Sequence, residues 1–240
     1  MGNGFEHFCP EHTCTLIVIL ISVISGCAVL KRTTDKMCDR TLMILAVLHL
    51  ILELLQDILL IRDGGDLISF LPLHLCNLGI FVNLAAVSTK GRISSFFSEI
   101  SVVLILPGSL GALLFPDWNY RPFWSYLPVL CFMTHAILVF IPVVFLIREK
   151  ACISFRHFWY SYAFLAVTVP PVFWFDKRFD QNYIFLRYPV YSSPLELIYD
   201  LTGEKYYIAG LLILLTAALI VEYLLYAVSS RLLRTNRKRI

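Results

Sequence analysis

Long apolar stretches constrain the fold of this chain more than any other feature of its sequence. A helix needs roughly 20 apolar residues to cross the hydrocarbon core of a bilayer, and seven segments reach or approach this length. With 58% hydrophobic and 15% charged residues, the chain is also more apolar than soluble domains are. We therefore expect an all-α, integral, multi-pass membrane protein in which residues 1–240 form one seven-helix domain. The expected spans are residues 13–30, 42–61, 67–87, 96–114, 126–147, 154–175 and 206–226.

The distribution of Lys and Arg predicts the orientation of these spans. Fourteen of the 20 basic residues lie in the first, third and fifth connections and in the C-terminal segment, and six lie in the other connections. The positive-inside rule then places the N-terminus outside and the C-terminus in the cytoplasm. We expect the plasma membrane of a bacterium or an endomembrane of a eukaryote. The net charge of +3 does not indicate a nucleic-acid partner.

The last outer connection, residues 176–205, is too long and too aromatic to be a simple link between helices. Its second half repeats apolar residues at helical spacing, which predicts a short amphipathic helix on the outer leaflet. Ser193 and Pro194 suit the start of that helix. We expect this loop to cover a cavity, with Tyr188 and Tyr191 among the residues that line it.

The second span carries a polar stripe. His49, Glu53, Gln56 and Asp57 are separated by four, three and one residues, so they share one face of a helix. A charged side chain at membrane depth costs about 2.5–3.5 kcal/mol on insertion scales. The stripe is therefore expected to face the interior of the bundle, with Gln56 lining a substrate cavity.

A thiol, an imidazole and a carboxylate are predicted at one depth. Counted from the outer ends of their spans, Cys76, His135 and Glu53 each lie eight or nine residues down. At a rise of 1.5 Å per residue, this is roughly 12–14 Å below the outer boundary. The three groups can therefore form a single site close to the bilayer midplane.

This combination suits covalent catalysis. A cysteine attacks as the thiolate and needs a base or a cation nearby, so Cys76 is the candidate nucleophile and His135 the candidate base. Glu53 or Asp57 could orient the imidazole, and a polar group of the third span could donate a hydrogen bond to an oxyanion. The supporting candidates are His49, Glu53, Asp57, His74, Asn77 and Asn83.

Other interpretations of the same residues remain open. Membrane cysteines commonly serve as small packing residues, and Cys27, Cys131 and Cys152 fit that role. The stripe of the second span could instead form the path of a proton- or ion-coupled transporter. No metal-ligand spacing is present, so we expect neither a metal nor another cofactor. Cys9 and Cys14 could pair in an oxidising compartment or remain free thiols.

Several short motifs, taken in order, resemble the YwaF-type integral membrane family. They are "FLPLHLCNLGIF", "LLFPDWNY", "CFMTHAILV", "NYIFL" and "SSPLELIYDLTGEKYYIAG", and they span roughly residues 67–212. That family includes a mammalian transmembrane acyltransferase that moves arachidonoyl chains onto lyso ether phospholipids. The resemblance implies that Cys76, in "LHLC", is the nucleophile and that His135, in "MTHAI", is its partner.

Together the residues and the resemblance predict an intramembrane acyltransferase. A phospholipid acyl chain would pass through a thioester on Cys76 to a lysophospholipid, or to water. Membrane phospholipid and lysophospholipid are the expected partners. The lipid would enter laterally from the outer leaflet.

Overall fold

The fold is entirely helical over the part of the chain that is described. The computed structural model describes residues 4–237, and side chains as far as residue 229. Short helical turns, η1 (Leu67–Phe70), η2 (Ser101–Ile105), η3 (Phe155–His157) and η4 (Tyr183–Phe185), connect or interrupt the longer helices. The α-helices are α1 (Pro10–Lys31), α2 (Asp35–Arg62), α3 (Leu75–Ser88), α4 (Gly91–Ile100), α5 (Leu106–Leu114), α6 (Tyr126–Ile147), α7 (Trp159–Phe179) and α8 (Pro194–Arg237).

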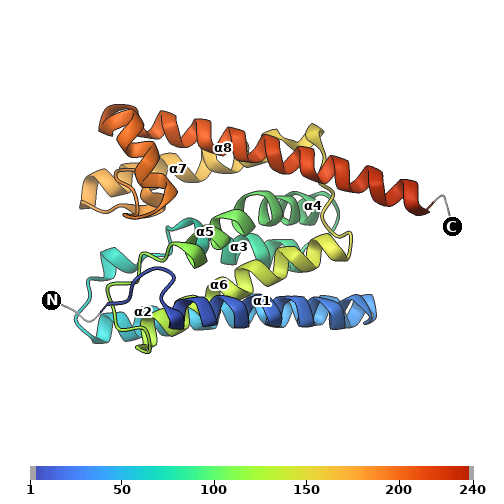
Figure 1. The fold of residues 1–240 in the computed structure, drawn as a ribbon, viewed down its shortest axis with the longest axis horizontal. Coiled ribbons are helices and arrows are strands. Elements are labelled where there is room, and N and C mark those ends of the chain that lie inside the picture. Colours follow the sequence, from blue (N-terminus) through green and yellow to red (C-terminus); the bar gives the residue numbers. More distant parts are fainter. Residues whose placement is uncertain (1–3, 238–240) are drawn as a thin grey trace.

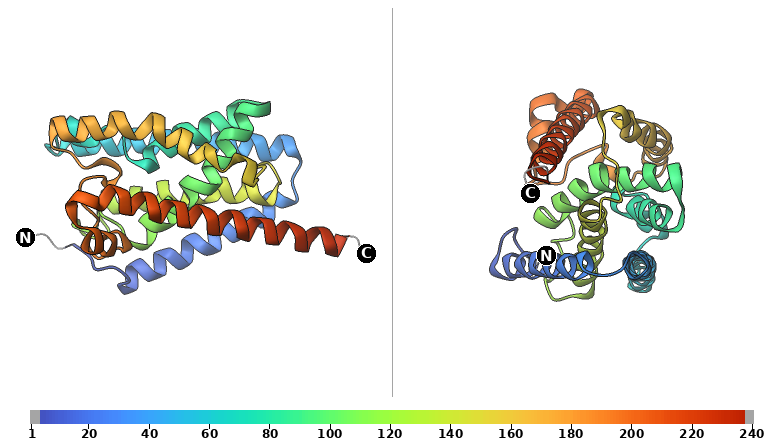
Figure 2. Two further views of the ribbon diagram at one scale, coloured as in Figure 1. Left: turned by 90° about the horizontal axis from the view of Figure 1, so that it is seen from above. Right: turned by 90° about the vertical axis from the view of Figure 1, so that its right-hand side faces the viewer.

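The helices form an elongated bundle in layers (Figures 1 and 2). Helices α1, α2 and α6 lie on one side, α7 and α8 on the other, and α3, α4 and α5 between them. We call the end at which α1 begins the N-terminal face. Three connections meet there, namely residues 63–74, 115–125 and 180–193, and α8 ends at the opposite face.

Six helices are long and apolar enough to cross a membrane, within the described residues. The chain is therefore an integral, multi-pass membrane protein. The count of seven such helices is not confirmed, because the expected span at residues 67–87 is not one continuous helix. Only its second part is α-helical, and the 14 residues of α3 rise about 21 Å, which is less than the hydrocarbon thickness of about 30 Å.

Pro72 and a distant tyrosine explain why the third pass is broken. The residue before a proline avoids the α conformation, and Leu71 is extended, with φ −63° and ψ 144°. Tyr183 bonds the freed backbone, since its hydroxyl accepts from Leu71 N at 3.0 Å and donates to Ile68 O at 2.6 Å. Burial raises the pKa of Tyr183 to about 12, so the hydroxyl stays protonated and can donate.

The middle layer contains a second irregularity. Helices α4 and α5 form one rod interrupted by the π-helical turn η2. Such turns frequently mark functional or strained positions. The Ser101 hydroxyl of this turn donates to Asn83 Oδ1 at 2.6 Å, so Asn83 joins α3 to the π-turn.

The expected outer loop at residues 176–205 is shorter in the structure. Helix α7 continues to Phe179 and α8 already begins at Pro194, so only residues 180–193 lack α-helix. The helix expected from Pro194 is present, and a turn at Gly203 separates it from the long part of α8. Gly203 has φ 66° and ψ 169°, a conformation that side chains with a Cβ rarely adopt.

Helix α3 packs closely on the rod and on α6 through Gly79. A Cβ atom at this position would lie 2.8 Å from Ile105 Cγ2 and 2.9 Å from Leu138 Cδ2. Both neighbouring side chains are buried. The absence of a side chain at Gly79 therefore allows α3 and α6 to approach each other at this level.

We expect Gly79→Ala to destabilise the protein by about 1–3 kcal/mol, because the added methyl overpacks this contact. Gly111→Ala in α5 is the matched control, since a Cβ there meets nothing within 4 Å and alanine favours the helix. Unfolding in mixed micelles should therefore show a loss of free energy for the first variant and none for the second. Equal stabilities of the two variants would contradict the close packing of α3.

A buried carboxyl group ties three elements together near the opposite face. Glu99 of α4 is completely buried. Tyr223 of α8 donates its hydroxyl to Glu99 Oε1 at 2.8 Å, and His157 of η3 lies with Nδ1 2.7 Å from Glu99 Oε2. The His157 ring also stacks on Tyr160 of α7, with ring centroids 4.6 Å apart. The cluster therefore joins the layer of α7 and α8 to the middle layer.

Candidate functional site

The packing register places Cys76 and His135 at one level of two neighbouring helices. Helices α3 and α6 both begin at the N-terminal face and run in the same direction (Figure 1). They touch where Gly79 faces Leu138. One helical turn towards the N-terminal face from this contact reaches Cys76 on α3 and His135 on α6. The thiol and the imidazole thus belong to adjacent turns of the two helices.

Cys76 lies in the first turn of α3, two residues after its N-cap, His74. The backbone N–H groups of Cys76 and Asn77 belong to this first turn. Such N–H groups have no acceptor within the helix and stabilise negative charge at a helix N-terminus. The sulfur is half-buried and packs beside an apolar cluster that includes Leu138.

His135 presents one ring nitrogen without a partner. It is buried, and its Nδ1 donates to the Cys131 carbonyl at 2.8 Å. A neutral imidazole that donates through Nδ1 carries its lone pair on Nε2. His135 Nε2 is buried and has no hydrogen-bond partner in the described chain. The ring is therefore held in the tautomer that can accept a proton at Nε2.

The polar stripe of α2 contacts both helices of this pair. The Asn77 amide donates to the Glu53 carboxylate, and the Cys131 thiol donates to Gln56 Oε1 at 3.3 Å. These contacts join α2 to α3 and to α6, respectively. Glu53 therefore positions Asn77 in the first turn of α3. Gln56, which was expected to line a substrate cavity, bonds Cys131 instead and is not among the residues that line the cavity at the N-terminal face.

The remaining residues of the candidate set differ in how they relate to this pair. His49 is buried on α2, its Nδ1 has no partner in the described chain, and its ring lies close enough to His135 for the two imidazoles to interact electrostatically. Asp57 is half-buried, one turn nearer the N-terminal face than Glu53. Asn83 lies two turns beyond Cys76, about 10 Å along α3, where it bonds Ser101. The structure thus joins Glu53 to Asn77, next to Cys76 in the first turn of α3. The register of α3 and α6 places His135 at the level of Cys76, and Asn83 lies outside this group.

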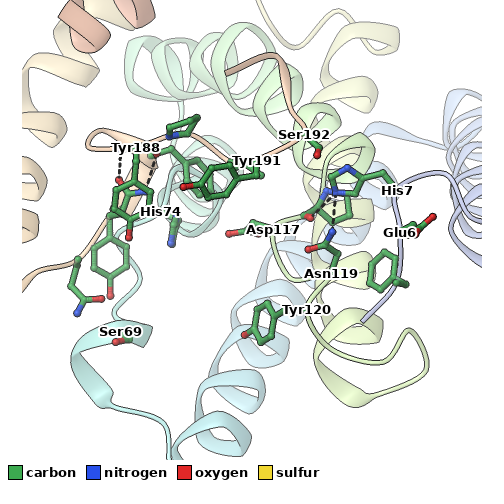
Figure 3. Close-up of a pocket in the computed structure, with 18 residues that line it drawn as sticks. Glu6, His7, Ser69, His74, Asp117, Asn119, Tyr120, Tyr188, Tyr191 and Ser192 are labelled. Carbon is green, nitrogen blue, oxygen red and sulfur yellow. Dashed lines mark hydrogen bonds between the residues drawn. The ribbon is translucent and has the colours of Figure 1, made fainter. Parts of the chain in front are cut away.

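A cavity of about 790 Å³ opens at the N-terminal face (Figure 3). Its walls come from the N-terminal segment, the connection between α5 and α6, and residues 181–192. Tyr188 and Tyr191 are among the lining residues, and so is His74, whose ring lies 4.9 Å from that of Tyr183. Cys76 and His135 are not lining residues of this cavity.

Two short links connect the cavity to the thiol and the imidazole. His74 lines the cavity, and Cys76 follows it by two residues. Asp117 also lines the cavity, and the ring of the next residue, Trp118, packs on His135 with ring centroids 4.8 Å apart. The charge of Asp117 acts on both Cys76 and His135. The residues that line the cavity are therefore directly linked to this pair through the N-terminus of α3 and through Trp118.

Sequence reasoning missed three residues of this region. Asp117 and Trp118 belong to "FPDWNY", which reads as an aromatic membrane-interface segment, although a carboxylate within such a segment is itself a signal. Cys131 was interpreted as a packing residue, but it precedes His135 by four positions and so shares its helix face. All seven cysteines, including Cys9 and Cys14, are free thiols in the structure.

The chemistry available here is nucleophilic. The group combines a thiol at a helix N-terminus, an imidazole with a free lone pair and a buried carboxylate. Among the described residues, no set of three His, Cys, Asp or Glu side chains is arranged to hold a metal ion. The arrangement is suited to acyl transfer through a covalent intermediate.

Comparison with known proteins gives one match. The model of the TMEM164 family matches residues 7–223. No curated protein matches the chain, and no solved structure does either. The comparisons give no support to the YwaF-type assignment that the sequence motifs suggest. The matched range includes all the residues of the group around Cys76.

Proposed function

Because the chain belongs to the TMEM164 family of transmembrane proteins, we propose that it is an intramembrane acyltransferase whose nucleophile is Cys76. It moves an acyl chain from a phospholipid to a lysophospholipid, and water is an alternative acceptor. One observation carries the proposal, namely the contact of Gly79 with Leu138, one turn from Cys76 on α3 and one turn from His135 on α6, whose Nε2 has no partner in the described chain.

The first half-reaction forms a thioester. The Cys76 thiol gives its proton to His135 Nε2 while the sulfur attacks the carbonyl carbon of the phospholipid ester. The free backbone N–H groups in the first turn of α3 stabilise the negative charge that develops on the carbonyl oxygen. The tetrahedral intermediate then expels the lysophospholipid alkoxide, which takes the proton from His135.

The second half-reaction restores the enzyme. The hydroxyl of a second lysophospholipid gives its proton to His135 Nε2 and attacks the thioester carbonyl. The sulfur leaves as thiolate and regains the proton from the imidazole. Glu53 acts indirectly in this scheme, because its carboxylate holds Asn77 and so fixes the first turn of α3.

The direct test follows label from one lipid to another. Purified protein is mixed with phospholipid that carries an isotopically labelled acyl chain and with an unlabelled lysophospholipid that has a different headgroup. We expect the label to appear on the second headgroup. A hydroxylamine-sensitive acyl adduct on the peptide that contains Cys76 should be detectable by mass spectrometry. Active protein without any such adduct would exclude the thioester.

Glu53→Gln separates this proposal from a transporter that uses the stripe of α2. Glutamine keeps an oxygen that can accept the Asn77 hydrogen bond, so we expect acyl transfer to fall by no more than about tenfold. A proton- or ion-coupled carrier would lose its function when this carboxylate is neutralised. Substrate uptake into liposomes that depends on Glu53 and continues in Cys76→Ser would favour the carrier.

A further inference from the structure

We propose that the cavity at the N-terminal face binds the ammonium group of a zwitterionic lipid headgroup, with Asp117 as its counter-ion. The inference rests on the proposed function in taking a lipid as the ligand. The observation that supports the inference is that the carboxylate of Asp117, which has no salt bridge with a described residue, and several aromatic rings line the same cavity.

The Asp117 carboxylate has no hydrogen bond or salt bridge in the described chain, and the imidazole of His74, which also lines the cavity, lies within range of its charge. Asp117 is exposed and projects into the cavity between the two walls (Figure 3). Two other acidic groups at this face are paired, since Arg187 binds Asp180 at 2.7 Å and Arg62 binds Asp63 at 3.2 Å.

The charged side chains in the described lining of the cavity are acidic. The lining includes the carboxylates of Glu6 and Asp117 and no Lys or Arg. A cation is therefore attracted to this cavity, and an anion is repelled unless it brings a cation with it. The phosphate of a lipid headgroup meets this condition only when an ammonium group accompanies it.

Aromatic rings surround the same space. Tyr120, Tyr188 and Tyr191 line the cavity and are at least 46% exposed. Their faces can contact an alkylammonium group by the cation–π interaction, which is also how quaternary ammonium ligands are recognised. The guanidinium of Arg121 already lies over the Tyr120 ring, 5.7 Å from its centroid, so Tyr188 and Tyr191 are the rings that a ligand would contact.

The position of the cavity fits a headgroup better than an acyl chain. It lies at the N-terminal face, where the connections between helices meet, and it is linked through His74 and Trp118 to the level of Cys76. A lipid with its ammonium group beside Asp117 would place its ester bonds towards the helices. The cavity would thus select the headgroup, and the thiol would act on the chain.

Binding of lipids that cannot react tests this inference apart from catalysis. Hexadecylphosphocholine and hexadecylphosphoglycerol have no carboxylic ester carbonyl for Cys76 to attack, and only the first has an ammonium group. Dissociation constants are measured for purified protein in maltoside micelles. We expect the phosphocholine compound to bind about tenfold more tightly than the phosphoglycerol compound, in line with a desolvated cation–π and ion-pair contact.

Asp117→Asn should abolish this preference by weakening phosphocholine binding about tenfold while leaving phosphoglycerol binding unchanged. Asp63→Asn is the matched control at the same face. Hydrogen bonds from Tyr126 and Arg62 hold the pKa of Asp63 below its ordinary value, so this carboxylate is already engaged and lies outside the cavity. It should change neither constant.

Tetramethylammonium distinguishes a lipid headgroup from a free cation. If tetramethylammonium displaces the phosphocholine probe only at concentrations far above the probe's dissociation constant, the ligand is a lipid. Displacement at comparable concentrations assigns the site to soluble ammonium compounds and overturns the lipid source. Equal affinities for the two probes, equal weakening of both by Asp117→Asn, or no binding of either would overturn the ammonium site. The label-transfer experiment is independent of all these outcomes.

Discussion

Replacing Cys76 by serine is expected to lower the rate of acyl transfer by at least about 10³-fold. A serine hydroxyl is far less acidic than a thiol, and a single imidazole provides little help in ionising it in an apolar site. Loss of a nucleophile that acts together with a base typically removes most of the catalytic acceleration. The rate of label transfer at saturating lysophospholipid measures the effect.

Cys152→Ser is the control for this substitution, because Cys152 is an exposed thiol far along the chain from the group around Cys76. It should transfer label at the wild-type rate. Cys76→Ser should unfold at the same denaturant concentration as the wild type, since oxygen replaces a half-buried sulfur of similar shape. A Cys76→Ser protein that retains more than a tenth of the activity would contradict the proposed nucleophile.

Removing the imidazole of His157 is expected to destabilise the fold by about 2–3 kcal/mol. His157→Ala deletes the group that lies 2.7 Å from Glu99 Oε2 and leaves a completely buried oxygen without its partner. The stacking of His157 on Tyr160 is lost as well. Unfolding in mixed micelles measures the change in free energy.

Two further variants assign this effect to the pair. Arg156→Ala, the exposed neighbour in sequence, should change stability by no more than about 0.5 kcal/mol. In the Glu99→Gln background, His157→Ala should cost at least about 1 kcal/mol less than it does alone, because contacting residues couple. A full and additive loss in that background would show that Glu99 and His157 act independently.

The sequence identifies the helices well because each apolar stretch must satisfy its own backbone in lipid. The spans at residues 126–147 and 96–114 correspond closely to α6 and to the rod of α4, η2 and α5. The polar stripe of α2 is likewise readable, since four polar groups with helical spacing indicate a single face. Its contacts with Asn77 and Cys131 follow from that face.

The features of the fold and the site that the sequence does not predict depend on contacts between residues far apart in the chain. The break at Leu71 and Pro72 is completed by Tyr183, 112 residues away from Leu71, and no local pattern predicts that bond. The count of residues above Cys76 assumed a continuous helix, which was wrong, yet the contact of Gly79 with Leu138 still places Cys76 level with His135. Asp117 was missed because loop packing, not periodicity, directs it into the cavity.

The bond from Tyr183 also sets an order for membrane insertion. When residues 67–88 leave the ribosome, the tyrosine that satisfies their backbone has not been synthesised. This third pass can therefore settle only after the chain has been made through α7 and η4. Nascent chains that end before residue 183 should remain bound to insertion machinery or be degraded.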